Sequence, residues 1–181
     1  MPGKICVIDV KISQEHETTD CVYKNKTCKY GRPIILEYYI GNYDNDNHKI
    51  KKEVIRQSLF NTDMLFLSND ILEELKDYDE LESQASKDIM EQFENDIKDV
   101  EVIISYDLEK QIKALQVECF KNCISITFKN FILIDIRYFN HDFEQSNLGE
   151  LKNILIKKEL DNNLKIIEKC FLKLYKSYKD E

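Results

Sequence analysis

The alternation of residue types near the start of the chain predicts a buried β-strand over residues 5–12. Residues at odd positions, including Asp9 and Lys11, share one face of this strand, and residues at even positions share the other. Both faces are mostly apolar, which indicates a central strand covered on two sides. Asp9 lies near the carboxyl end of the strand, where open α/β sheets place their ligands.

Two further strands are predicted before any helix. The first covers residues 33–40, which are rich in β-branched and aromatic side chains, and Gly41-Asn42 is expected to end it. The second, over 49–59, alternates loosely and carries enough charge to resist edge-to-edge pairing. The polar segment 13–32 is expected to form a long hairpin loop or the start of a strand.

Helical periodicity begins in the middle of the chain. A short helix is expected over 71–75, capped from Ser68-Asn69-Asp70, and a second helix is expected to be capped by Ser86. The second helix carries an apolar stripe on one face and charged residues on the other. The apolar stripe is Ile89, Phe93 and Ile97, and the charged residues are Lys87, Glu91 and Glu94.

Strands and helices then alternate. A buried strand is predicted over 101–106, and Asp107 directly after it is expected to cap a helix. The core face of that helix carries Ile112, Leu115 and Cys119. Residues 124–128 and 131–136 supply one or two more strands. Three antiparallel strands followed by this alternation predict an α/β fold with a mixed sheet, in which right-handed crossovers add the later strands in parallel.

Two more helices are expected near the end, over 148–156 and from about Asp161 onward. The last helix has a core stripe consisting of Leu164, Ile167, Phe171, Leu174 and Tyr178. Its outward stripe consists of Lys165, Lys169, Lys173 and Lys176. A lysine row of this kind is usually a solvated face, and contact with phosphates is the alternative.

Composition changes the picture mainly by exclusion. The 181 residues, 43% hydrophobic and 33% charged, with 4 Gly and 2 Pro, favour one domain over 1–181. No apolar run approaches the ~20 residues that span a bilayer, and no signal peptide is recognisable, so we expect an intracellular protein, in the cytoplasm or the nucleus, without a membrane partner. The net charge of −8 disfavours a nucleic-acid-coating protein but not one local groove.

The six cysteines fit an intracellular chain as free thiols. Cys6, Cys119 and Cys170 fall on faces that are expected to be buried. A zinc site is the alternative, but the spacings available are not the tight paired pattern of structural zinc. Those spacings are Cys21 to Cys28 and Cys119 to Cys123, with His16 nearby.

The element order, the chain length and several anchors resemble the DEDD-type 3′–5′ exonucleases, a branch of the ribonuclease H-like superfold. The resemblance covers nearly the whole chain and implies a mixed sheet of five to six strands flanked by helices. The first strand of that family ends in Asp-x-Glu, whereas this chain has Asp9 followed by Lys11 at the position of the Glu.

The other family motifs are matched in position more than in chemistry. The second motif is a small residue, His, Asn, two variable residues, Phe and Asp; it aligns with Ser105, Tyr106, Asp107, Lys110 and Gln111. The next family strand corresponds to the one that contains Asp135. The last helix of the family carries His, four residues and Asp, for which the nearest match is Asn163 with Glu168.

Two-metal phosphodiester hydrolysis needs several carboxylates to hold ions about 4 Å apart, and a base, typically a His. Lys11 stands in place of one acid, and its ammonium group would repel the metal. We expect Lys11 to pair with Asp9 or Asp107 instead. The residues weighed as substitutes for the missing ligands and base are Glu17, Asp135, His141 and Asp142.

The leading hypothesis is a catalytically inactive exonuclease-like domain that acts as a protein-interaction or scaffold module in nucleic-acid metabolism, with a protein partner and no cofactor. The alternative is a divergent active 3′–5′ exonuclease that uses Mg or Mn, and a single-strand nucleic-acid binder without catalysis is a further alternative. No phosphate loop, nucleophile elbow or dinucleotide fingerprint is recognisable. The candidate residues of the altered site are Asp9, Lys11, Asp107, Gln111, Asp135, Asn163 and Glu168.

Overall fold

A computed structural model describes residues 3–13, 16–23, 26–44, 47–61, 67, 69–139 and 162–180. Its strands are β1 (Lys4–Ile12), β2 (His16–Tyr23), β3 (Lys26–Tyr30), β4 (Pro33–Asp44), β5 (Lys49–Phe60), β6 (Ser83–Gln84), β7 (Val100–Ser105) and β8 (Ile132–Asp135). Its helices are α1 (Asn69–Leu75), α2 (Ser86–Asp96), α3 (Leu108–Lys121) and α5 (Asn163–Asp180). Short 3₁₀ turns are η1 (Lys76–Tyr78), η2 (Phe128–Asn130) and η3 (Ile136–Phe139).

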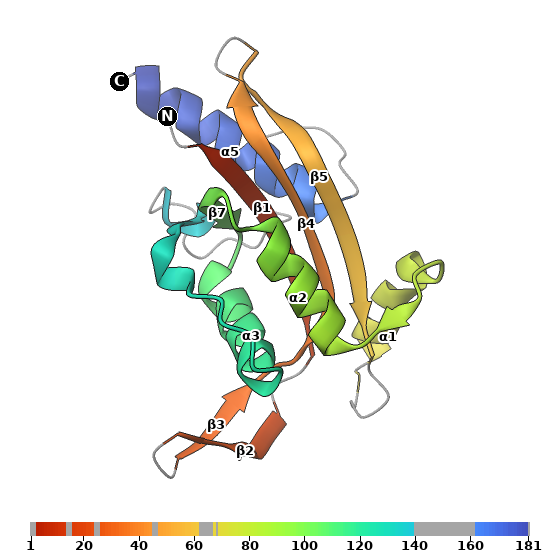
Figure 1. Cartoon of the computed structure of the whole chain (residues 1–181). Coiled ribbons are helices and arrows are strands. Elements are labelled where there is room, and N and C mark those ends of the chain that lie inside the picture. The colour runs from red at the N-terminus through yellow and green to blue at the C-terminus, as the bar shows by residue number, and fades with distance from the viewer. Residues whose placement is uncertain are drawn as a thin grey trace.

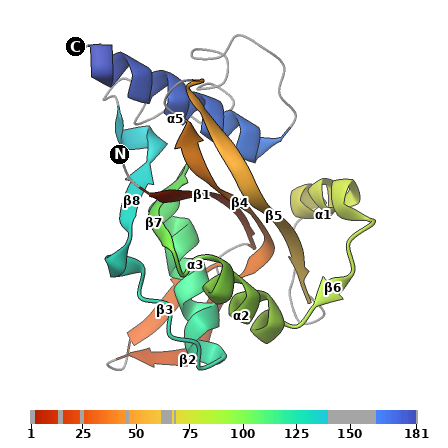
Figure 2. The same ribbon diagram turned by 45° about the horizontal axis from the view of Figure 1, so that its top comes forward.

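A six-stranded mixed sheet in the order β6-β5-β4-β1-β7-β8 forms the centre of the fold (Figure 1). β1 pairs antiparallel with β4 and parallel with β7, and β7 pairs parallel with β8. β8 therefore forms one edge of the sheet, and β5 with the short β6 forms the other (Figure 2). This arrangement confirms the α/β fold class, with antiparallel strands first and parallel additions afterwards.

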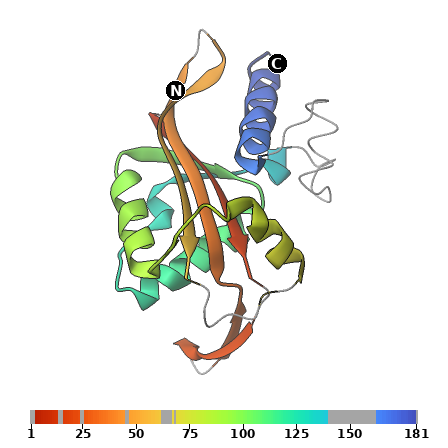
Figure 3. The same cartoon turned by 90° about the vertical axis from the view of Figure 1, so that its right-hand side faces the viewer.

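Helices cover both faces of the sheet (Figure 3). On one face Ile8 of β1 packs with Phe93 of α2 and Leu115 of α3 in a buried cluster. On the other face Val7 packs with Ile167 of α5. The alternation along β1 therefore feeds two separate cores, as the sequence predicts. Burial of each such side chain contributes roughly 1.5–3 kcal/mol to the free energy of unfolding, so packing on both faces fixes the strand that carries Asp9.

The sequence predicts that the strand beginning at Pro33 ends at Gly41-Asn42, and this prediction is wrong. β4 continues to Asp44, with a register shift between Ile40 and Gly41 in its pairing with β5. A Cβ atom at position 41 would collide with the backbone carbonyl of Lys51. Gly41 is therefore required by the close approach of the two strands, and it does not act as a terminator.

The polar segment 13–32 is more ordered than a loop. It contains β2 and β3, which pair antiparallel in a separate two-stranded sheet. The sequence also gave no sign of β6, whose two residues pair with Leu59 and Phe60. Conversely, residues 124–127 form no strand despite their β-branched side chains, and η2 follows them. Ile124 and Ile126 pack on the core beside α3 as an irregular segment.

Two predicted helix caps are wrong, because each of the two side chains bonds to a residue of another element. Ser86 is the first residue of α2, its hydroxyl donates to Glu118, and no side chain caps the helix at Ala85. Asp107 stands at the N-cap of α3 with a left-handed backbone (φ 57°) and makes no side-chain cap bond. The first amide of α3, at Leu108, instead donates to Asp135, 2.8 Å away.

The C-terminal helix follows the predicted stripes where its side chains are described. Leu164, Ile167 and Phe171 are buried, whereas Lys165 and Lys169 are exposed. The helix expected over 148–156 and the residues Ser68, His141 and Asp142 lie outside the described residues. Among the described helices, none is long and apolar enough to cross a membrane.

Candidate functional site

Asp9 is held from two helices that are far apart in the sequence. Its carboxylate, 7% exposed, accepts from Gln111 Nε2 of α3 at 3.3 Å on Oδ1 and from Asn163 Nδ2 of α5 at 3.0 Å on Oδ2. A carboxylate only accepts hydrogen bonds, so each amide must turn its nitrogen toward Asp9. The structure thus brings together three of the residues that the family motifs marked.

Gln111 is fixed further by the end of β7. Its Oε1 accepts from Ser105 Oγ at 2.9 Å, and its Nε2 also donates to the carbonyl of Tyr106 at 2.8 Å. Ser105 Oγ in turn lies 2.7 Å from the carbonyl oxygen of Ile8. Ser105 and Gln111 are buried. A polar network of this kind is stable because every buried member finds partners, and it orients the Gln111 amide toward Asp9.

Glu37 is a site residue that the sequence analysis missed. It lies directly opposite Asp9 in the β1–β4 pairing, which places their Cβ atoms roughly 4.5–5.5 Å apart. Burial, reinforced by the charge of Asp9, raises the pKa of Glu37 above its ordinary 4.5, although a hydrogen bond from Gln57 opposes the shift. An acid inside the apolar run 33–40 was the available signal, but only the strand register connects it to Asp9.

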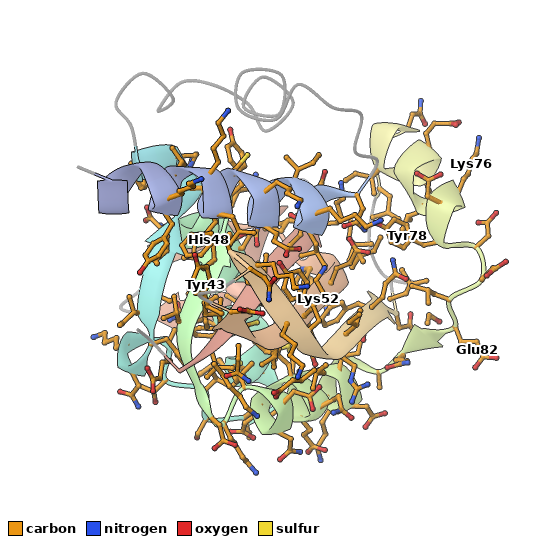
Figure 4. The ribbon with its side chains drawn as sticks, turned by 90° about the horizontal axis from the view of Figure 1, so that it is seen from above. Tyr43, His48, Lys52, Lys76, Tyr78 and Glu82 are labelled. Atoms are coloured by element: carbon orange, nitrogen blue, oxygen red, sulfur yellow. The ribbon has the colours of Figure 1, made fainter. Side chains whose placement is uncertain are left out.

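Tyr78 borders the same carboxyl group from η1. Burial first, and the charge of Glu37 second, raise the pKa of the Tyr78 phenol. Figure 4 shows Tyr78 at the α1–η1 segment, near the end of α5 where that helix begins. No sequence pattern indicates Tyr78 or Gln57, because both approach the site only through tertiary packing.

Two neighbouring cavities share Lys11 and Asn163 and together form a cleft over the end of β1. One, of about 340 Å³, is lined by residues that include Asp9, Asp107, Lys110, Gln111, Lys11 and Asn163. The other, of about 400 Å³, is lined by Lys11, Glu37, Gln57, Asp77, Tyr78, Asn162 and Asn163. We call Asp9, Lys11, Glu37, Gln111 and Asn163 the Asp9 site. Whether Lys11 pairs with Asp9 or Asp107 stays a prediction.

Asp135 and Asp107 are joined by one arginine. Arg137 Nη2 lies 2.8 Å from Asp135 Oδ2 and 3.0 Å from Asp107 Oδ1. Asp135 also accepts from the amide of Leu108, so it acts as the cap of α3 from an adjacent strand. Asp107 lines the cleft, whereas Asp135 lines a different cavity beside β8. Asp135 therefore positions α3 and lies apart from Asp9.

Glu168 of α5 forms an ion pair with a lysine of the sheet. Its Oε2 lies 3.0 Å from Lys52 Nζ on β5, and Lys52 pairs with Gly41. Asp9 pairs with Glu37, which is four residues before Gly41 on β4. The strand partners of Asp9 and Lys52 are therefore about 13 Å apart along β4.

The pair of Glu168 and Lys52 also surrounds Tyr39. Lys52 Nζ lies 4.0 Å above the Tyr39 ring, and Figure 4 shows Lys52 beneath α5. Burial and then the Glu168 charge raise the pKa of Tyr39. Glu168 is thus part of a pairing of α5 with β5.

The cysteine candidates form no site in the part of the chain with described side chains. Cys119 is buried and Cys123 exposed, and the described residues contain no group of three His, Cys, Asp or Glu placed to hold a metal ion. Burial raises the pKa of Cys119 and of Cys170 to about 11. The side chains of Glu17, Cys21 and Cys28 lie outside the described ones.

The donor set around Asp9 does not fit a pair of divalent cations. Mg²⁺ and Mn²⁺ prefer oxygen ligands, with carboxylates supplying the charge. Both oxygens of Asp9 instead face amide N–H groups, and the Lys11 cation lines the same cleft. Glu37 is the second acid, and burial raises its pKa above the ordinary value, which opposes a charge beside Asp9. The charge and the lone pairs that two metals require are therefore not assembled here.

Comparison with known proteins gives a fold and no sequence family. No protein-family model and no curated protein matches the sequence. A 3′-exonuclease from a study of 3′-end-specific recognition of a histone mRNA stem-loop is similar over 97% of this chain and 83% of its own, with a TM-score of 0.69 and 13% identity. S. pombe Pop2p, in a Mg²⁺- and Mn²⁺-bound form, is similar over 97% and 84%, with a TM-score of 0.66 and 11% identity.

A third solved structure is similar over still more of both chains. The nuclease domain of 3′hExo, a DEDDh family member bound to rAMP, covers 99% of this chain and 93% of its own, with a TM-score of 0.65 and 14% identity. The chain therefore has the ribonuclease H-like fold of the DEDD-type 3′–5′ exonucleases. Because the sequence identities are this low, the similarity shows the fold alone. The chemistry depends on the residues of the Asp9 site.

Proposed function

We propose that this chain is a catalytically inactive exonuclease-like domain that acts as a protein-interaction module in RNA or DNA metabolism. The observation that carries the proposal is the double engagement of Asp9, whose two oxygens accept from Gln111 and Asn163. Gln111 and Asn163 stand at two of the three positions where this chain replaces an acid or a base of the family motifs, and Lys11 stands at the third. The amides of Gln111 and Asn163 donate hydrogen bonds to the Asp9 carboxylate. Gln111 also removes a negative charge that would attract metal ions.

The charge balance supports the same conclusion. Stabilising a phosphodiester transition state requires cations between the enzyme carboxylates and the phosphate. With the Lys11 cation in the cleft and amides at Gln111 and Asn163, the Asp9 site offers only Asp9 and Glu37 as carboxylates to hold such cations. No histidine is among the lining residues of either cavity, so the base that would activate water is also missing from this lining.

The retention of the fold supports an interaction role. Both cores are densely buried even though the motif residues have changed, and folds are commonly kept while their sites change. A net charge of −8 makes a general nucleic-acid surface a poor description of the chain. A protein partner is therefore the binding class that we propose, without a cofactor.

One observation favours a second candidate, a divergent metal-dependent 3′–5′ exonuclease. Glu37 supplies a carboxyl group opposite Asp9 that the family motifs do not include. If both groups ionised together, they could share one Mg²⁺ or Mn²⁺ ion, the cations found in the S. pombe Pop2p structure.

The experiment that separates these candidates is a nuclease assay. Purified chain is incubated with 3′-labelled single-stranded RNA and DNA plus Mg²⁺ or Mn²⁺, beside the Asp9→Ala and Glu37→Gln variants. We expect no metal-dependent shortening above that of the Asp9→Ala protein. Shortening that both substitutions abolish would establish the second candidate and overturn the first.

A further inference from the structure

A groove runs along the β8 edge of the sheet, on the side covered by α3. It has a volume of about 680 Å³ and is lined by Leu108, Glu109, Ile112, Lys113, Gln116, Leu133, Ile134, Asp135 and Tyr138. We call it the β8 groove. It shares no lining residue with the cleft of the Asp9 site. Figure 2 shows β8 at the edge of the sheet, with α3 nearby.

The β8 edge exposes apolar side chains. Ile132, Leu133 and Tyr138 are 58%, 43% and 61% exposed, and β7 is the only strand that pairs with β8 among the described residues. Phe120, four residues after Gln116 on α3, is 75% exposed and extends the helix face that lines the groove. An edge strand of this kind presents backbone donors and acceptors to any chain that lies beside it.

The opposite edge of the sheet is protected in the usual way. β6 has only two residues. β5 carries many charged side chains, including Lys51, Lys52 and Glu53. Short strands and charges prevent edge-to-edge association. β8, with the sequence Ile-Leu-Ile-Asp, is also short, but its first three residues carry no charge.

The charged groups at the groove are paired within the chain. Lys113 Nζ lies 2.6 Å from Glu109 Oε1, and Arg137 Nη2 lies 2.8 Å from Asp135 Oδ2. What remains for a ligand is a neutral surface with aliphatic walls, one amide at Gln116 and one phenol at Tyr138. Such a surface complements an uncharged, apolar segment better than an acidic or basic one.

The size of the edge argues against a second copy of this chain. Four residues of strand extend about 13 Å, so self-pairing of β8 would cover far less than the roughly 800 Å² per partner of a standard interface. An extended peptide needs less area, because it gains main-chain hydrogen bonds along β8 and inserts alternate side chains into the groove.

We propose that β8 and its groove form a docking site for an extended, uncharged, apolar segment of a partner protein, which adds to the sheet as a further strand beside β8. This inference rests on the interaction role proposed above, and it names the surface and the chemistry of the partner. Leu133 lines the groove and is expected to contact a side chain that the bound segment turns toward it.

The test uses the full chain and random peptides of about seven residues, the length of a short strand, displayed on phage. Selected peptides are synthesised with blocked ends and titrated into the ¹⁵N-labelled chain without nucleic acid or divalent metal. Leu133→Glu is compared with Ile55→Glu, a matched control because Ile55 is an exposed isoleucine of the same sheet (66% exposed). Circular dichroism of both variants verifies that they fold.

We expect selected peptides to be apolar and to shift the amide signals of 132–135. Leu133→Glu should weaken binding by about tenfold or more, and Ile55→Glu should leave it unchanged. The inference is overturned if no peptide binds, if the shifts map elsewhere, or if Ile55→Glu weakens binding equally. It is also overturned if the β8 amides that do not bond to β7 are already protected from hydrogen exchange without peptide, by a dimer or by another part of this chain. Nuclease activity would refute the proposed function but leave these binding results standing.

Discussion

Gln111 Nε2 lies 3.3 Å from Asp9 Oδ1, and this contact joins α3 to the central strand at the point where the family motifs expect two carboxylates. Because Gln111 also bonds Ser105 and Tyr106, its amide cannot turn away without breaking other buried contacts. The acid at Asp9 therefore remains as part of a structural network. The network gives the buried carboxylate hydrogen-bond partners from the chain itself, which offset the cost of its burial.

A double-mutant cycle tests this coupling. Gln111→Leu should lower the free energy of unfolding by about 1–3 kcal/mol, because Asp9 and Ser105 each lose a buried partner. Combined with Asp9→Leu, the loss should be smaller than the sum of the two single losses, since no carboxylate is then left unpaired. Urea unfolding measures the free energy of unfolding of wild type, the two single variants and the double variant. Strict additivity would show that the two residues do not act as a unit.

Asp135 is expected to matter more for stability than Asp107. Asp135→Ala removes the partner of the Leu108 amide and of Arg137, and should cost about 1–3 kcal/mol. Asp107→Asn is the matched control, because it removes the other Arg137 contact and still tolerates the left-handed backbone. It should cost about 0–1 kcal/mol, since the Asp107 side chain is 38% exposed. Equal losses from both substitutions would contradict the capping role of Asp135.

The strands whose formation depends on burial could be predicted from the sequence. Features that depend on strand register or on side chains from distant elements could be predicted less well. The apolar runs around Ile8 and Ile103 predicted β1 and β7 because both faces of those strands are buried. Ser86 and Asp107 looked like caps, but Glu118 and Asp135 come from other elements and compete with local bonds. No local pattern contains that information.

The candidate site was predictable to a similar degree. Motif spacing placed Gln111 and Asn163 at Asp9 because the fold fixes the ends of those elements. Glu37 needed the β1–β4 register, which a sequence pattern specifies only once the pairing is known. Tyr78 belongs to a short turn that reaches the cleft through packing alone. The sequence thus predicts the residues that keep motif positions and misses those that tertiary contacts recruit.

Glu37 should make stability depend on pH. Its folded pKa is raised above its ordinary 4.5, so the folded state holds a proton that the unfolded state releases. The contribution of Glu37 is therefore fully present below about pH 4.5 and is lost as pH rises through its folded pKa. Glu37→Gln should remove this loss, so that the variant gains stability relative to the wild type as pH rises.

Urea unfolding at a series of pH values from acid to neutral checks the expectation for Glu37. Glu91→Gln, on the exposed face of α2, controls for the change in net charge. A difference between Glu37→Gln and wild type that stays constant over this range would show that Glu37 ionises as readily in the folded state as in the unfolded one.

The cysteines should differ in reactivity. Cys123 is exposed, whereas burial raises the pKa of Cys119 and Cys170 to about 11 and also raises that of Cys6. At pH 8 the folded chain should be alkylated by iodoacetamide at Cys123 and spared at the three buried positions, because the thiolate is the reactive form. Peptide mass spectrometry identifies the sites, with the urea-unfolded chain as the fully labelled control. Rapid labelling of Cys170 in the folded chain would contradict its burial against the core.

The most direct test of the central claim is the binding of Mn²⁺ to the Asp9 site, followed by electron paramagnetic resonance. Wild type and Asp9→Ala are titrated beside a triple variant, Lys11→Glu, Gln111→Asp and Asn163→His, which restores the acids and the base of the family motifs. We predict that wild type and Asp9→Ala bind Mn²⁺ alike and weakly, and that the triple variant gains binding. Two Mn²⁺ ions bound tightly by wild type and lost in Asp9→Ala would contradict the account.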